Sequence, residues 1–76
     1  MSRLQAMELF VTAVREGSFS AAGRRAGLSP ASVARHVAAL EASLGVQLLH
    51  RTSRSLTLTE AGREYHTRLE QVLHSI

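Results

Sequence analysis

Gly17, Gly27 and Gly45 divide the first part of the chain into short segments, and this division is what most limits its fold. Glycine ends helices readily because it adopts the left-handed backbone conformation at no steric cost. The segment before Gly17 has apolar residues spaced as on one face of a helix: Leu4, Met7, Phe10, Val11 and Val14. We predict a helix over 4–16 and a second one that Ser18 or Ser20 caps and that runs to about Ala26.

A third helix is predicted over 30–44. Ser29 is a suitable N-cap, and Pro30 fits the first helical position, where its missing N–H is not needed. After Gly45, leucines flank the polar stretch 52–55, which predicts a short hairpin; they are Leu48, Leu49, Leu56 and Leu58. Thr59 then caps a final helix.

This order of elements is that of a winged helix-turn-helix. The predicted fold class is mainly α: a three-helix core with a short two-stranded wing, followed by a C-terminal dimerisation or linker helix. We assign 1–58 to the winged helix-turn-helix and 59–76 to that last helix.

Size argues for self-association. A chain of 76 residues fits one small domain, and a single core of this size rarely supplies more than about 3 to 5 kcal/mol. The sequence has no cysteine, so disulfides and thiolate zinc sites are excluded as further stabilisation. A partner subunit remains.

The positive charge is concentrated in the middle of the chain. The net charge is +3, but between Gly17 and Leu58 five arginines face Glu41 alone, a local balance of +4. Such a basic region suggests a face directed at an extended polyanion, of which a nucleic acid duplex is the commonest. No run of 18 apolar residues occurs, so we expect a soluble, untargeted chain without a membrane partner.

The third helix has two distinct faces. Val33, Val37, Leu40 and Leu44 fall on one side and are predicted to face the core. The other side carries Ala31, Arg35, Ala38 and Ala42, with Ser32 and Ala34 at its flanks. Small side chains allow close approach to a surface, and an arginine can grip guanine or phosphate, as in a recognition helix in the major groove. An ordinary solvated helix is the alternative.

The hairpin tip carries Arg51, Thr52, Ser53 and Arg54 with no acid to neutralise them. This composition fits a wing that reaches the DNA backbone or minor groove. Arg24 and Arg25 are better explained as solvated surface residues, and His36 as a neutral residue at the edge of the DNA face.

Several linked motifs resemble the LysR-type transcriptional regulators. They are Gly17-Ser-Phe-Ser-Ala-Ala, Leu28-Ser-Pro-Ala-Ser-Val-Ala-Arg-His-Val, Leu40-Glu, Leu44-Gly-Val-Gln-Leu-Leu, Arg51-Thr-Ser-Arg and Leu58-Thr-Glu-Ala-Gly. The resemblance covers the chain from Leu4 onward. It implies a bacterial, cytoplasmic and nucleoid-associated repressor or activator that binds a pseudo-palindromic promoter site as a homodimer.

The residues assigned to DNA by composition, position and this resemblance are Ser20, Ser29, Pro30, Ala31, Ser32, Ala34, Arg35, His36, Arg51, Thr52 and Arg54. Two departures from the family pattern are Ala34, where a serine is common, and Leu49, where a phenylalanine is frequent. The first changes the expected site preference. Family members are about four times longer and carry a C-terminal effector-binding domain, so we expect this chain to be an excised DNA-binding domain without a small-molecule site.

The final helix carries an apolar seam that is longer than the small core can cover. This predicts a homodimer in which two chains pair through the seam. The predicted dimerisation residues are Tyr65, Leu69, Val72, Leu73 and Ile76. The alternative is that Tyr65 and Leu69 pack on the first helix of the same chain.

Enzymatic activity is not expected. His66 and His74 are eight residues apart, about 12 Å along a helix, which is too far for one metal ion. No phosphate-binding glycine loop or catalytic constellation is present, and we predict neither a metal nor another cofactor. The main rival is a winged helix used only to bind protein, whose affinity would depend weakly on salt.

Overall fold

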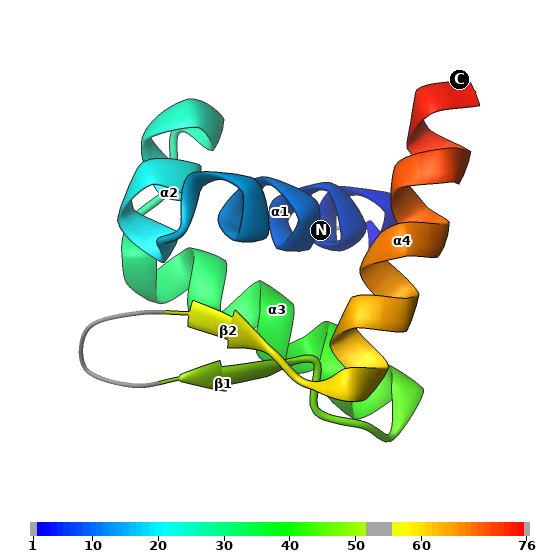
Figure 1. Cartoon of the computed structure of the whole chain (residues 1–76). Coiled ribbons are helices and arrows are strands. Elements are labelled where there is room, and N and C mark those ends of the chain that lie inside the picture. The colour runs from blue at the N-terminus through cyan, green and yellow to red at the C-terminus, as the bar shows by residue number, and fades with distance from the viewer. Residues whose placement is uncertain (1, 52–55, 76) are drawn as a thin grey trace.

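The computed structural model describes residues 2–51 and 56–75. Their element order is α1 (Arg3–Glu16), α2 (Phe19–Ala26), α3 (Pro30–Leu44), β1 (Leu49–Arg51), β2 (Leu56–Leu58) and α4 (Glu60–Ser75). In Figure 1, α4 stands at one end of the molecule and the hairpin points toward the other. The predicted fold class, a winged helix-turn-helix followed by a helix, is confirmed.

The helix boundaries follow the local signals in the sequence. Gly17, Gly27 and Gly45 all take the left-handed conformation directly after α1, α2 and α3. Of the two serines offered as the cap of α2, Ser18 performs the role, and its hydroxyl accepts the N–H of Ala21 at 3.1 Å. Glycine stops and polar caps act within one helical turn, so the sequence predicts them well.

The hairpin is a two-stranded antiparallel sheet. Leu49 pairs with Leu58, and Arg51 pairs with Leu56. Thr59 follows β2 and caps α4, since its hydroxyl accepts the N–H of Gly62 at 2.9 Å. The sheet therefore leads directly into the last helix.

The core joins α1, α3, the start of β1 and α4. Its largest fully buried side chains are Phe10, Leu48, Leu49, Val33 and Val37. One prediction is wrong: Leu44 was expected in the core but is 37% exposed. It is the last residue of α3, where Gly45 turns the chain away, and it lines an open groove with residues of α4.

Candidate nucleic-acid interface

The N-terminal turn of α3 is held by side chains one turn apart. The Ser29 hydroxyl accepts the N–H of Ser32 at 3.1 Å and donates to the Ser32 hydroxyl at 3.1 Å. Arg35 donates from Nη2 to the Ser32 hydroxyl, also at 3.1 Å. Pro30 occupies the first turn, as predicted. This end of α3 thus presents hydroxyls, a guanidinium and the positive end of the helix dipole together.

The outer face of α3 is as open as the sequence suggests. Four of its residues are exposed, namely Ala31, Arg35, Ala38 and Ala42. Ser32 and Ala34 are half-buried at the edges of this face. Because three of the four exposed side chains are methyl groups, the backbone of α3 can come close to a partner surface.

His36 lies on the flank of α3 that meets the beginning of α1. It is half-buried and lines a shallow groove with Ser2, Arg3 and Ser43. Arg3 donates to the Ser43 hydroxyl across this groove at 2.6 Å. His36 therefore borders the outer face, as expected, but it turns toward α1.

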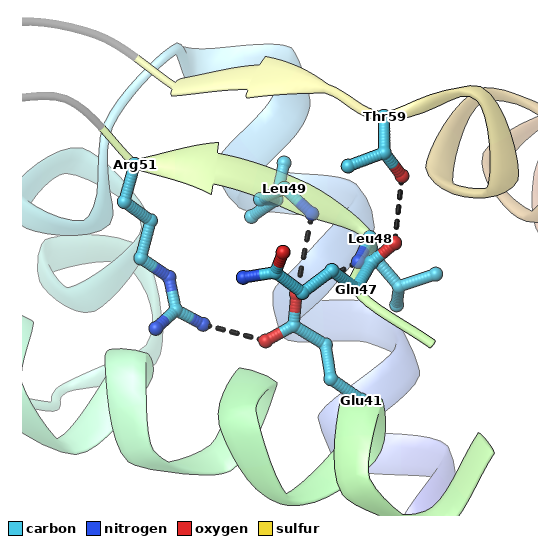
Figure 2. A network of polar contacts seen from close by, with 6 residues as sticks. All are labelled: Glu41, Gln47, Leu48, Leu49, Arg51 and Thr59. Carbon is cyan, nitrogen blue, oxygen red and sulfur yellow. Dashed lines mark hydrogen bonds and ion pairs between the residues drawn. The ribbon is translucent and has the colours of Figure 1, made fainter. Parts of the chain in front are cut away.

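A carboxylate joins the wing root, residues 48–51, to the C-terminal part of α3. Glu41 accepts two backbone N–H groups through Oε2, that of Leu48 at 2.8 Å and that of Leu49 at 3.2 Å. Its Oε1 pairs with Arg51 Nη2 at 2.8 Å, as Figure 2 shows. One side chain of α3 thereby holds both ends of β1, Leu49 through its backbone and Arg51 through its side chain.

Arg51 was predicted to have no neutralising acid, and that prediction is wrong. Besides its ion pair with Glu41, its guanidinium carbon lies 5.6 Å from the centre of the Phe19 ring at the start of α2. The Arg51 side chain remains 40% exposed. Glu41 was counted in the charge balance of this region but was not paired with Arg51. The two residues are ten positions apart and meet only because the chain folds back after Gly45.

The remaining predicted contacts of the wing, Thr52 and Arg54, lie outside the described residues, as does Ser53. Ser20 is exposed on the first turn of α2, next to Phe19. It is thus close in sequence to a residue that touches the wing root.

Arg24 and Arg25 are both exposed, as a solvated surface would have them. Arg25 also pairs with Glu16 of α1 through Nε at 3.4 Å. This ion pair connects α2 to α1.

The apolar seam of α4 is largely covered within the chain. Tyr65 is half-buried with its ring centre 5.9 Å from that of Phe10, and Leu69 is only 6% exposed. Leu73 is also partly buried against the core, whereas Val72 is 56% exposed and Ile76 lies outside the described residues. The alternative that Tyr65 and Leu69 pack on the first helix is what the structure shows, because α4 lies against α1.

The Tyr65 hydroxyl is buried and has no hydrogen-bond partner among the residues that the structure describes. Burial raises the pKa of this phenol, and the positive charge of Arg3 opposes that shift.

Sequence reasoning missed three residues that build the site: Glu41 as a buried anchor, Phe19 as the surface under Arg51, and Gly62. A β-carbon at Gly62 would overlap the carbonyl oxygen of Leu48, so only glycine lets α4 lie this close to the start of β1. The one signal available was that Glu41 is the single acid within a basic region.

Within residues 2–51 and 56–75, no three His or Glu side chains gather as a metal site. In the same ranges, no helix is long and apolar enough to cross a membrane.

Comparison with known proteins gives a consistent result. The model of the family described as bacterial regulatory helix-turn-helix protein, lysR family, matches residues 4–63. The chain is 43% identical over 76 residues to the HTH-type transcriptional activator AaeR of Escherichia coli strain K12. That match covers all of this chain and 25% of the relative, so the chain spans about a quarter of the relative's length.

Two solved structures share the fold over almost the whole chain. Full-length AphB, a virulence activator of Vibrio cholerae, superposes with a TM-score of 0.90 at 35% identity, over 99% of this chain and 26% of AphB. The CbnR DBD in complex with DNA superposes with a TM-score of 0.87 at 32% identity, over 97% of this chain and 84% of that one.

Proposed function

The chain belongs to the lysR family of bacterial regulatory helix-turn-helix proteins, and on that premise we propose that it binds double-stranded DNA sequence-specifically as the DNA-binding domain of a transcriptional regulator. In this proposal α3 enters the major groove, and the wing over 50–55 lies on the backbone or minor groove. Such a role belongs in the bacterial cytoplasm and involves no catalysis. Sensing of an effector by the rest of such a regulator is not part of it.

The observation that carries the proposal is the open outer face of α3. Its methyl side chains leave room for base edges, and Arg35 reaches out from the same face with a planar donor group. Ser29 and Ser32 stand at the adjacent helix end, where hydroxyls and free N–H groups suit a phosphate. The likeness to CbnR DBD, which was solved in complex with DNA, supports DNA binding by this chain.

The proposed base and backbone contacts are those of the sequence analysis on α3 and in the wing: Ser29, Pro30, Ala31, Ser32, Ala34, Arg35, Thr52 and Arg54. Ser20 and His36 are proposed at the edges. Arg51 differs from these residues, because its guanidinium contacts Glu41 and Phe19 of the same chain.

The first experiment is selection of bound duplexes from a random-sequence library at about 100 mM salt, where nonspecific phosphate contacts weaken. We expect an enriched inverted repeat. Arg35→Ala should then lose about 1 to 3 kcal/mol of binding free energy at one base position. The control Thr67→Ala, which changes an exposed residue of α4, should bind as the parent chain does. Equal affinity for the enriched and scrambled duplexes, with little dependence on salt, would instead favour a protein-binding winged helix.

We also propose that two chains pair through α4, with 1–58 as the DNA-binding unit and 59–76 as the dimerisation or linker helix. Support comes from Val72, a large apolar side chain exposed on α4 next to the partly buried Leu73. Since Leu69 is part of the core, substituting it would unfold the chain and would not test pairing.

Val72→Glu tests the pairing. We expect sedimentation to show a dimer for the parent chain at high micromolar concentration and a monomer for the variant, because a carboxylate would be buried without a partner. Thr67→Glu adds the same charge at another exposed position of α4 and should leave the mass unchanged. A parent chain that sediments as a monomer would contradict the proposal.

A further inference from the structure

Glu41 is the buried charged residue of the region that the structure describes, with 9% of its surface exposed. Burying a carboxylate is costly unless every oxygen is paired and hydrogen-bonded. Here both oxygens are used: one by the backbone N–H groups of Leu48, just before β1, and of Leu49, the first residue of β1, and the other by Arg51. The pair is therefore a single unit, in which Arg51 supplies the charge that allows Glu41 to bind the strand.

The guanidinium of Arg51 is directed into the fold on two sides. It donates to Glu41 of α3 and lies over the ring of Phe19 of α2. Figure 2 shows it turned back from the end of β1 toward α3. Arg51, the last residue of β1, thus connects this strand to both helices of the helix-turn-helix.

The other strand is fixed nearby. The Thr59 hydroxyl donates to the carbonyl of Gln47 at 2.7 Å, and the Thr59 N–H donates to the carbonyl of Leu48 at 3.0 Å. Because β2 ends at a fixed point as well, the position of the wing relative to α3 depends on whether the outer end of β1 is held. Arg51 is the side chain that holds it.

Electrostatics argue against Arg51 as a phosphate ligand. A guanidinium that already faces a carboxylate at 2.8 Å forms a neutral pair and attracts a phosphate weakly. If it left for the DNA, the buried carboxylate of Glu41 would lose its counter-charge. Both effects favour the internal contact.

We propose that Arg51 serves DNA binding as a positioning residue: held by Glu41 and Phe19, it sets where the wing starts relative to the recognition helix, and it does not itself bind a phosphate. This inference rests on the proposed DNA-binding function.

Glu41→Gln separates the two roles by the sign of its effect. The variant removes the charge that holds Arg51, so a positioning role predicts about tenfold weaker binding to the selected duplex, the equivalent of one charge-assisted hydrogen bond. A phosphate-binding Arg51 predicts equal or tighter binding, since the guanidinium is released and a negative charge near the DNA disappears. Glu64→Gln makes the same charge change at an exposed position of α4 and is the matched control.

Arg51→Gln should weaken binding by a similar factor, and the double variant should bind no more weakly than either single one, because both changes remove the same contact. All affinities are measured at a temperature at which circular dichroism shows each variant folded. If Glu41→Gln does not fold, Phe19→Leu replaces it: this variant keeps an apolar side chain but removes the ring under Arg51. We expect about two- to threefold weaker binding for it, in line with an exposed cation–π contact.

The inference is wrong if Glu41→Gln binds the selected duplex as tightly as Glu64→Gln does, or more tightly. It is also wrong if Phe19→Leu binds the duplex as tightly as the parent chain does. Failure of the parent chain to bind any duplex is a different result, which overturns the proposed function itself.

Discussion

Helix α3 is joined to the rest of the fold very differently at its two ends. At its N-terminal turn, Ser29, Ser32 and Arg35 bond to one another and remain at the surface. Near its C-terminal end, Glu41 is buried and binds the strand of the wing. The difference separates two tasks: side chains that would read DNA depend only on their own helix, whereas the wing depends on contacts that also hold the core together.

Substitutions at the two ends of α3 should therefore have different effects. Changes in the N-terminal turn of α3 should alter DNA binding with a small cost in stability, because the contacts there are solvated and local. Changes at the wing root should lower stability and DNA binding together, because Leu48 and Leu49 belong both to the wing and to the buried core.

Gly62→Ala is expected to have the largest effect on stability, since it breaks the wing root. The new methyl group would overlap the Leu48 carbonyl, which accepts the N–H of Thr59. We expect a loss of about 3 kcal/mol in the free energy of unfolding, measured by urea denaturation. A core of this size supplies little more than that.

The control for Gly62→Ala is Thr67→Ala, at an exposed position of the same helix, which should change stability by no more than about 0.5 kcal/mol. The sign of the Gly62→Ala effect is decisive. Helix propensity alone favours alanine over glycine by about 1 kcal/mol, so a stabilised variant would show that α4 does not need its close contact with Leu48.

The same contrast explains how much the sequence could predict. The glycines that end α1, α2 and α3, the caps Ser29 and Thr59, and the outer face of α3 were all predicted because each depends on neighbours within a turn or two. Their physical causes are contained in short stretches of sequence.

What the sequence did not predict depends on segments that meet only in three dimensions. The Arg51–Glu41 pair requires the chain to fold back after α3, and the burial of Leu69 requires α4 to lie against α1. Leu44 shows the opposite error. It continues the apolar face of α3, but it is the last residue of the helix and is not buried in the core. Periodicity gives the apolar face of a helix, and only the tertiary contacts decide how far along the helix that face is covered.

Ser29→Ala has the smaller expected effect and tests the other side of the comparison. It removes the cap of α3, whose hydroxyl accepts the N–H of Ser32, so the free energy of unfolding should fall by about 1 kcal/mol. Ser20→Ala is the matched control, because Ser18 caps α2 and the exposed Ser20 does not; a change of a few tenths of a kcal/mol at most is expected. The amide resonances of Leu48 and Leu49 should stay in place in Ser29→Ala and move in Gly62→Ala. If the loss of the cap moved them as well, the two ends of α3 would be coupled, and the N-terminal turn could not be changed for a new DNA site without disturbing the wing.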